Sequence, residues 1–427
     1  MHITILAHGS RGDVQPYVAL GISLKQAGHS IRLAAPELFR SFVAEYGLDF
    51  ASLAGDPRIL MQNAVEQAGG KPDLFRTIRV VLKYAMPVAL QVIDDVRQAC
   101  QGTQAIVHSF LTTSVGHETA LQLGVPDFSA LVFAVFSPTT AFPNAAFPAL
   151  PLGGWYNRFT HDVFTQAYWQ GGRLAYNWAR RGKGHEYPPL SEWPFAVRNQ
   201  QLTPILYGFS PYVLPKPPEW GKDIHVTGFW NLPAPASWSP PDELVSFLKA
   251  GSPPVFIGFG SIIAQDAARL TKLVLAALSK TGQRGVLVSG WGGLIKECLP
   301  EQVFFIESVP FDWLFSRVAG AVIHGGIGTT AAALQAGIPL AVIPFTADQS
   351  FWGDQVYRLG IGPKPIPHRK LTVENLSQAI LEIVSNPVLR QRASQVGFAL
   401  RSENGVENAA RIIEHYLMRS SGFELKR

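Results

Sequence analysis

One pattern in the second half of the chain constrains its fold more than any other. A short apolar run over residues 320–324 stops at glycines, helical spacing follows over 329–336, and a second apolar run covers 339–343. Two parallel strands joined by a helix need this order, because the helix carries the chain back to the start of the next strand. The pattern therefore predicts a doubly wound, Rossmann-like α/β domain.

The first half of the chain opens with the same pattern, in which an apolar start meets a glycine turn at Gly9, then helical spacing and another apolar run. The 427 residues exceed what one hydrophobic core usually organises. Between the halves lies a segment too rich in proline for regular structure. We predict four parts: a Rossmann-like domain at 1–210, a Pro-rich interdomain linker at 211–241, a second Rossmann-like domain at 242–405 and a final helix at 406–427.

Composition narrows the class of protein. A hydrophobic share of 47% with 16% charged residues is typical of a globular chain. The net charge of +5 is dispersed, so we expect no nucleic-acid partner, while an anionic ligand or peripheral contact with a membrane surface stays open. Cys100 and Cys298 are too few for a disulfide framework, and the opening apolar run is too short for a signal peptide. We expect a cytoplasmic protein.

A charge-free, phenylalanine-rich stretch covers residues 128–157. Its length invites comparison with a membrane span, but its four prolines would break a continuous helix repeatedly. We interpret it as loops that line an apolar pocket, with Phe136 and Phe142 as candidate acceptor contacts.

The glycine turn of the second domain has the composition of an anion site. His324 ends the strand and Gly325, Gly326 and Gly328 follow it, before a helix that we expect to be capped by Thr329 or Thr330. Glycines admit a ligand close to the backbone, and the amides at a helix start attract negative charge. A plain strand-to-helix turn is the alternative interpretation.

Neighbouring segments extend this candidate site. Asp348 and Gln349 follow the next strand, and a carboxylate with an amide can hold several sugar hydroxyls. The turn that ends at Ser261 has a similar glycine pattern, and Trp291 stands between glycines where it could stack on a nucleobase. Each of these two signals alone is also compatible with a structural turn or a core aromatic residue.

Other nucleotide chemistries lack their motifs. Neither glycine turn of the second domain is followed by Lys-Ser or Lys-Thr, so a P-loop is absent. The turn from Gly9 to Asp13 lacks the three spaced glycines of a dinucleotide fingerprint. Neither the segment from Gly258 to Ser261 nor the one from Ser114 to Gly116 is a Gly-x-Ser-x-Gly hydrolase elbow.

Five segments carry a resemblance to a known family: HGSRGDVQPYVALG, YGFSPYVLPKPPEW, VTGFWNLP, VPFDWLF and HGGIGTTAAALQAGIPLAVIPFTADQSFWGDQ. Together they resemble the sterol glucosyltransferase and antibiotic glycosyltransferase branch of the UDP-glycosyltransferase superfamily. The resemblance implies a GT-B fold, two Rossmann-like domains facing across a cleft. It further implies that the first domain holds the acceptor, that the second holds the nucleotide sugar, and that the last helix crosses back to the first.

The resemblance also implies roles for single residues. Asp13 matches the catalytic base, for which a helix N-cap or a partner of Arg11 is the alternative role. The donor-binding residues would be Ser261, Trp291, His324, Gly325, Gly326, Gly328, Thr329, Asp348 and Gln349. Two positions depart from the family pattern, because Ile323 and Phe311 stand where histidines are usual.

The activity implied is inverting transfer of a hexose from a UDP-sugar, or a deoxythymidine diphosphate sugar, to a hydroxyl of a lipophilic acceptor such as a sterol, terpenoid or polyketide. No cofactor and no metal are expected. His8 and His108, near the ends of expected strands, are alternative bases or acceptor contacts. A non-catalytic nucleotide-sugar or lipid-binding protein and a nucleotide-sugar epimerase are the rival hypotheses.

Overall fold

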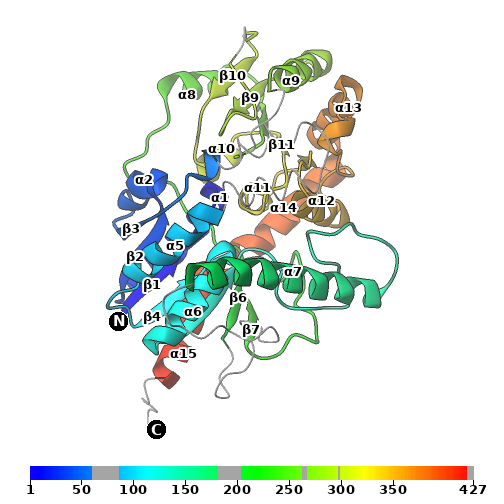
Figure 1. Cartoon of the computed structure of the whole chain (residues 1–427). Helices are drawn as coiled ribbons and strands as arrows, with labels where there is room; N and C mark the ends of the chain where they lie inside the picture. Colours follow the sequence, from blue (N-terminus) through cyan, green and yellow to red (C-terminus); the bar gives the residue numbers. More distant parts are fainter. Residues whose placement is uncertain (60–85, 181–202, 262–266, 297–298, 421–427) are drawn as a thin grey trace. The chain divides into compact units, whose positions relative to one another are not determined.

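The computed structural model describes residues 1–59, 86–180, 203–261, 267–296 and 299–420. The chain divides into two compact units (Figure 1). The first contains residues 1–211, 216–230 and 404–427, and the second contains residues 212–215 and 231–403. Helix α15 (Gly405–Ser420) therefore belongs to the same unit as the start of the chain, where it packs against α1 (Arg11–Gln26).

The first unit is built on one parallel sheet with the strand order β3-β2-β1-β4-β5-β6-β7. Its strands are β1 (His2–Leu6), β2 (Ser30–Pro36), β3 (Asp49–Leu53), β4 (Ala105–His108), β5 (Asp127–Leu131), β6 (Ile205–Tyr207) and β7 (Ile224–Val226). Besides α1 and α15, its elements are η1 (Glu37–Phe39), α2 (Arg40–Ala44), α5 (Met86–Ala99), η3 (Phe110–Thr112), α6 (Thr113–Leu123) and α7 (Gly154–Arg180).

The second unit is built on a five-stranded parallel sheet with the order β10-β9-β8-β11-β12. Its strands are β8 (Val255–Gly258), β9 (Gly285–Val288), β10 (Val303–Ile306), β11 (Gly320–Ile323) and β12 (Leu340–Val342). Its helices are α8 (Asp242–Lys249), α9 (Ala267–Thr281), α10 (Phe311–Phe315), α11 (Ile327–Ala336), α12 (Ala347–Arg358), η4 (His368–Lys370), α13 (Val373–Ser385) and α14 (Pro387–Arg401).

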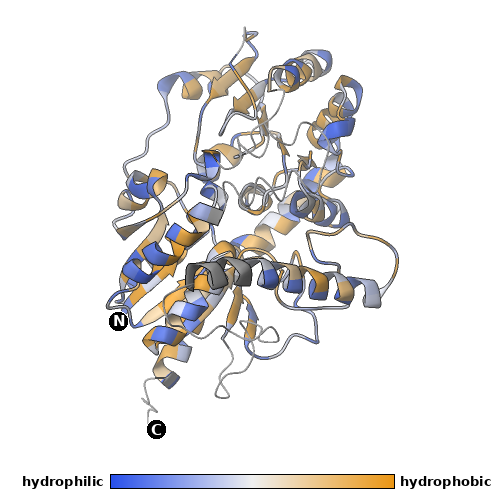
Figure 2. Cartoon of the chain, viewed as in Figure 1, coloured by the Kyte–Doolittle hydropathy of each residue, from blue (hydrophilic) through white to orange (hydrophobic). Residues whose placement is uncertain are grey.

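Both sheets are buried in the way that parallel sheets require. Every residue of β4, β8, β9 and β11 is buried, and Figure 2 shows the strands as hydrophobic while the helices also carry hydrophilic faces. Continuous apolar strands are expected where helices cover both faces of a sheet. Since all strands of a sheet run in one direction, the loops after their carboxyl ends gather at one edge, where ligands bind in such folds.

The proline-rich segment contributes more to the structure than a connection. Within it, β7 forms the edge strand of the first sheet by pairing with β6, and Trp220 and Trp230 are buried. The indole of Trp230 donates to the hydroxyl of Thr227 at 2.9 Å. A short edge strand with buried indoles explains how so many prolines fit into a packed unit, because edge strands tolerate the loss of backbone donors.

Candidate functional site

The second unit holds His324 at the carboxyl end of β11. The residue follows the buried strand end Ile323 and is itself 8% exposed. Gly325 has φ of +92°, a conformation that favours glycine, and a Cβ there would come within 2.7 Å of the backbone oxygen of Gln349. The glycine after the histidine is therefore required both by the turn and by the approach of the α12 backbone.

The imidazole packs against glycines of two turns, its own and the turn after β8. A Cβ at Gly260, after β8, would lie 2.6 Å from Cε1 of His324, and a Cβ at Gly326 would fall inside contact distance of Nε2. The turn after β9 joins them, because the backbone N–H of Trp291 donates to the carbonyl of Gly260 at 3.2 Å. These turns follow β9, β8 and β11, which are adjacent in the sheet. The predicted phosphate turn thus packs against the turn after β8 through His324, and the turn after β9 packs against the turn after β8.

Burial determines the charge of this histidine. It lowers the pKa of the His324 imidazole to about 4. The backbone of Gly258 acts in the opposite direction and raises this pKa, but by less. The ring is therefore neutral at pH 7, with one N–H to donate. Its Nδ1 atom is buried without a hydrogen-bond partner among the described residues. A neutral imidazole packed among glycines can bind an anion through a hydrogen bond, and a bound anion would raise its pKa.

Helix α11 presents its N terminus at the same place. Its N-cap is Gly326, in an extended conformation and without a side-chain cap. The expected capping by Thr329 or Thr330 is wrong, since both residues lie inside the first turn, and the Thr330 hydroxyl donates back to the Gly326 carbonyl at 2.9 Å. The first amides of the helix have no side-chain cap, which is the arrangement that binds phosphate oxygens. The space beside Gly328 is open, because a Cβ at that position would meet no heavy atom within 4 Å.

The predicted sugar-binding pair lies at the start of α12. Thr346 caps this helix, and the Oε1 atom of Gln349 accepts from the backbone N–H groups of Phe345 at 2.8 Å and Thr346 at 3.2 Å. Gln349 is buried, whereas Asp348 is half-buried and accepts from the Thr346 hydroxyl at 2.7 Å. The capping box orients both side chains, and it leaves the Gln349 amide nitrogen and the Asp348 carboxylate as groups that can contact a ligand.

The remaining donor-side candidates occupy the same set of loops. Ser261 is half-buried in the turn after β8, and Trp291 is half-buried between Gly290 and Gly292, both of which have positive φ. A half-buried indole on a turn at the sheet edge is accessible to a stacking ligand.

The two departures from the family pattern have structural roles. Ile323 is fully buried and pairs with Gly258 on β8 and Val342 on β12. Phe311 begins α10, where it stacks on Phe315 with ring centroids 4.9 Å apart. An apolar side chain at each position therefore contributes to packing of the second unit.

In the first unit, Asp13 lies in the first turn of α1, directly after β1. Ser10 is the N-cap, and its backbone N–H and hydroxyl both donate to Oδ2 of Asp13, at 2.7 and 2.8 Å. Asp13 is thus the third helical residue of a capping box and not the cap itself. A Cβ at Gly9, whose φ is +128°, would lie 2.5 Å from that oxygen. The glycine allows the half-buried carboxylate to lie against the backbone at the sheet edge.

The two alternative histidines lie in different settings. Nε2 of His8 contacts the carbonyl of Ala54 at 2.9 Å, and burial lowers the pKa of this half-buried ring. His108 is fully buried, and its Nε2 lies 2.9 Å from Oδ2 of Asp127, which also contacts Nδ1 of His117 at 2.8 Å. Hydrogen bonds from the two histidines bring the pKa of Asp127 to about 2 against the opposite effect of burial. Burial lowers the pKa of His108, so the neutral ring is part of a hydrogen-bond network with Asp127 and His117.

The phenylalanine-rich stretch is packed into the first unit. Phe136 and Phe142 are 4% and 5% exposed, and Phe142 packs edge-on against His161 and Trp220. Neither side chain is in position to line an open pocket in this conformation. Burial of both rings shows that a charge-free stretch signals packing as readily as a binding surface.

An aromatic cluster that the sequence motifs did not indicate surrounds Phe136. It consists of four half-buried rings, with centroids 4.9 to 6.5 Å from a neighbouring ring: Phe110, Phe133, Phe164 and Tyr168. The Tyr168 hydroxyl donates to the Phe110 carbonyl at 2.6 Å. Phe110 begins η3, separated by one residue from the end of β4. The spacing of Phe164 and Tyr168 places both on one face of α7. That spacing was the signal available in the sequence.

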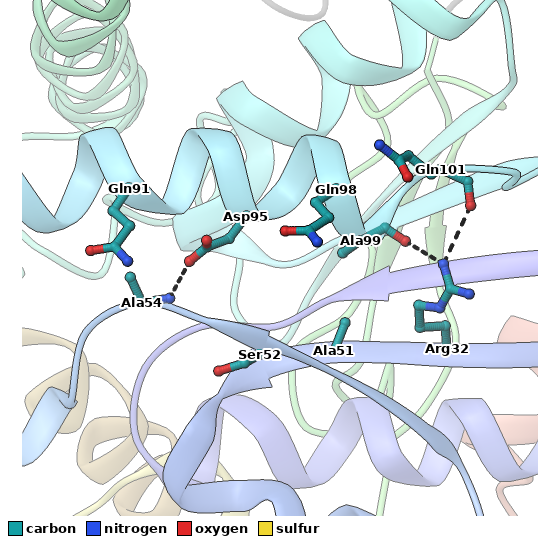
Figure 3. Close-up of a pocket in the computed structure, with 9 residues that line it drawn as sticks. All are labelled: Arg32, Ala51, Ser52, Ala54, Gln91, Asp95, Gln98, Ala99 and Gln101. Atoms are coloured by element: carbon teal, nitrogen blue, oxygen red, sulfur yellow. Dashed lines mark hydrogen bonds between the residues drawn. The ribbon is translucent and has the colours of Figure 1, made fainter.

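Two recesses lie elsewhere in the first unit. The larger, of about 700 Å³, lies between β3 and α5 and is lined by residues of β2, β3 and α5 (Figure 3). Its charged groups are already engaged, because Nη1 of Arg32 donates to the carbonyls of Ala99 and Gln101 at 2.8 and 3.3 Å, and Asp95 accepts from the backbone of Ala54 at 2.7 Å. It contains none of the candidate site residues.

The described part of the chain contains neither the side-chain cluster of a metal site nor a helix that could span a membrane. These residues contain no group of three His, Cys, Asp or Glu side chains that could hold a metal ion. Within the same ranges, no helix combines the length and the apolar character needed to cross a membrane.

Two family models match the chain. The glycosyltransferase family 28 N-terminal domain matches residues 3–113, and the erythromycin biosynthesis protein CIII-like C-terminal domain matches residues 292–414. A sterol 3-beta-glucosyltransferase of Arabidopsis thaliana is 34% identical over 98% of this chain and 68% of its own length. The corresponding protein of Pichia angusta is 35% identical over 96% of this chain and 33% of its own. The chain spans between about a quarter and about two thirds of the curated relatives that it matches first.

Solved structures agree on the architecture. The calicheamicin glycosyltransferase has a TM-score of 0.71 at 17% identity and covers 98% of both chains. A glycosyltransferase solved in complex with deoxythymidine diphosphate has a TM-score of 0.63 at 17% identity, covering 98% of this chain and all of its own. Both likenesses concern the fold, which for this chain is the GT-B fold of two parallel-sheet α/β units.

Proposed function

Because the chain belongs to the UDP-glycosyltransferase family, in the branch that contains the sterol 3-beta-glucosyltransferases, we propose that it transfers a hexose from a UDP-sugar to a hydroxyl of a lipophilic acceptor. Glucose is the proposed hexose, and a sterol is the first acceptor to test. The observation that carries the proposal is the packing of His324 against glycines of its own turn and of the turn after β8, beside the uncapped start of α11. The turn after β9 adjoins them through its contact with Gly260. This arrangement suits a diphosphate, which is the leaving group of the reaction.

The donor contacts would divide among the loops of the second unit. The amides at the start of α11, with Gly325, Gly326 and Gly328 around them, and the N–H of His324 would hold the diphosphate. Ser261 and Thr329 would add hydroxyl contacts. Asp348 and Gln349 would bind sugar hydroxyls, and Trp291 would stack on the base.

The chemical step needs a base and a stabilised leaving group. In the proposed reaction Asp13 takes the proton of the acceptor hydroxyl, and the acceptor oxygen bonds to the anomeric carbon as the bond from that carbon to the diphosphate breaks. UDP leaves as an anion that the α11 N terminus and the His324 N–H stabilise. One displacement inverts the anomeric configuration. His8, which burial keeps neutral at pH 7, is the second candidate for the base.

The acceptor would contact the aromatic cluster of Phe110, Phe133, Phe164 and Tyr168. Half-buried rings offer apolar area to a rigid polycyclic ligand without a large ordering cost. Phe136 supports this cluster from within. Protein groups alone would stabilise the negative charge on the leaving diphosphate. We therefore propose transfer without a metal or another cofactor. We further propose that the reaction occurs in the cytoplasm, at the membrane surface where such acceptors partition.

The test is transfer from labelled UDP-glucose to a panel of sterols, terpenoids and polyketides, with deoxythymidine diphosphate glucose as the alternative donor and a chelator as the metal control. The expected product is a β-glucoside from an α-linked donor, identified by its anomeric proton signal. Binding of UDP-glucose without any product would favour a non-catalytic binding protein. An altered sugar released without acceptor would favour an epimerase. Retained anomeric configuration would contradict a single displacement by the acceptor oxygen.

A further inference from the structure

The second recess of the first unit lies between the edge strand β7 and the C-terminal helix α15, which Figure 1 labels at the lower part of the view. Its volume is about 580 Å³, within the range of about 300 to 1,000 Å³ usual for small-molecule sites. It is lined by Lys222, Asp223, His225, Val226, Thr227, Asn408, Arg411, Ile412, His415, Tyr416 and Arg419. We call it the β7–α15 recess. None of these residues is a candidate for donor, acceptor or base.

The charge of this recess is strongly unbalanced. Lys222, Arg411 and Arg419 are exposed cations that line it, whereas Asp223 is the one carboxylate among its described lining residues. That carboxylate already accepts the hydroxyl of Tyr416 at 2.7 Å. His225 and His415 also line the recess and would add charge on protonation.

Other charged groups of the described residues lie close to the recess. Lys216 lies close enough to lower the pKa of His225, together with burial, which is the larger cause. On α15, Oε1 of Glu414 lies 3.4 Å from Nε2 of His29, so this carboxylate is paired with a residue outside the recess. Glu407 is exposed in the first turn of the helix, one turn before Arg411. Like charges held around one hollow repel each other, and an anion relieves this repulsion.

Hydrogen bonds order the walls of the recess. Nδ2 of Asn408 donates to the carbonyl of Thr227 at 3.1 Å and ties α15 to the end of β7. Oδ1 of the same Asn408 accepts from Nη2 of Arg411 at 2.9 Å, which orients the guanidinium. Across the recess, the hydroxyl of Tyr416 lies 3.3 Å from Nε2 of His225. An oriented guanidinium loses less freedom when it binds a ligand.

We propose that the β7–α15 recess binds a phosphate monoester. Guanidinium groups match phosphate oxygens in geometry and bind them through paired, charge-assisted hydrogen bonds. The larger recess beside β3 is less suited, because the carbonyls of Ala99 and Gln101 already occupy the donor of Arg32 that faces them. The phosphate can come from the head group of a lipid or from a soluble metabolite, and both sources present the same chemistry.

The experiment measures binding of two matched probes to the full chain with UDP at saturation, so that the donor site is occupied. Vesicles of phosphatidylcholine containing phosphatidic acid present the monoester on a membrane, and glycerol 3-phosphate presents it in solution. The test variant is Arg411→Gln with Arg419→Gln. We expect its affinity to fall by about fivefold for each arginine removed, the usual scale for a basic residue near an anionic surface.

The control variant, Arg40→Gln with Arg158→Gln, removes the same charge from exposed positions of the same unit outside the recess. It should keep the parental affinity. Lys222→Gln provides a second test on the β7 side if the double variant melts at a lower temperature. Loss of binding confined to the recess variants supports the proposal, and the probe that binds identifies the source of the phosphate.

Equal loss in the control variant, or no binding of either probe by the parent, overturns the proposal. The result is independent of the proposed transfer reaction. A recess variant should transfer sugar to a soluble acceptor at the parental rate, whereas failure of the proposed function would leave the parent inactive while probe binding persisted.

Discussion

The two candidate binding regions differ in what builds them. Around His324, glycine turns and a helix start form the site. A side chain has no room at Gly325, against the backbone of Gln349, or at Gly260 and Gly326, against the His324 ring. Around Phe110, the first unit instead presents aromatic side chains that pack on one another. A site built from closely packed glycine turns admits few substitutions, whereas a site built from side chains can change its shape one residue at a time. We therefore expect one added methyl group on the donor side to impair donor binding strongly. Removal of one ring on the acceptor side should change acceptor binding only moderately.

The largest effect is expected for Asp13→Asn. The amide oxygen can still accept the hydrogen bonds of Ser10, so the capping box survives, but the proton acceptor of the reaction is lost. We expect kcat to fall by about a hundredfold to ten-thousandfold, with UDP binding and the melting temperature close to those of the parent. Steady-state kinetics, UDP titration and a melting curve measure the three quantities. Near-normal turnover would contradict the role of Asp13 and direct attention to His8.

The next effect is expected for His324→Ala, which removes the N–H that would face the diphosphate. Loss of one such donor costs about a hundredfold to a thousandfold in kcat, while the KM for acceptor should stay near the parental value. His324→Gln, which keeps a donor, is expected to recover part of the rate. A loss of tenfold or less, or equal weakening of acceptor and donor use, would argue that the buried imidazole only supports the turn.

A smaller effect, on UDP affinity, is expected for Gly326→Ala. The backbone of Gly326 has ordinary angles, with φ of −63°, so the methyl group itself is the perturbation, and it collides with the imidazole of His324. We expect weaker UDP binding, by about tenfold or more if a hydrogen bond of roughly 1.5 kcal/mol or greater is displaced. Gly171→Ala is the matched control, because a Cβ there meets no heavy atom within 4 Å. Unchanged UDP affinity in Gly326→Ala would mean that the imidazole moves aside without cost to the ligand.

The smallest effect on catalysis is expected on the acceptor side, from a pair of variants. Phe164→Ala removes a half-buried ring and should raise the KM for acceptor severalfold with little change in UDP affinity. Phe136→Ala removes a buried ring, and it should cost about 3 to 5 kcal/mol of unfolding free energy. Acceptor kinetics and chemical denaturation separate the two outcomes. If Phe164→Ala leaves the KM unchanged for every acceptor, the cluster has a packing role alone.

The sequence alone determined the features that depend on residues close to one another along the chain. The strand, glycines and helix around His324 follow one another within a few positions, so their order already predicted an anion site. The family motifs likewise predicted site roles for Asp13, Asp348 and Gln349, and those roles stay predictions. The helix cap was wrong by three or four residues, because threonines in a first turn resemble a cap in sequence while Gly326 takes that position in the structure.

Only the tertiary structure showed which residues distant in the sequence lie next to one another. Gly260, Trp291 and His324 come together because β9, β8 and β11 are adjacent in a sheet whose order differs from the order of the sequence. The same applies to His108 and Asp127, which meet across neighbouring strands. It also applies to α15, whose Asn408 and Tyr416 contact Thr227 and His225, 181 and 191 residues away in the sequence. Burial of Phe136 and Phe142 also depends on residues distant in the chain. Local patterns report backbone conformation, whereas strand order and burial arise from non-local packing, which no short segment encodes by itself.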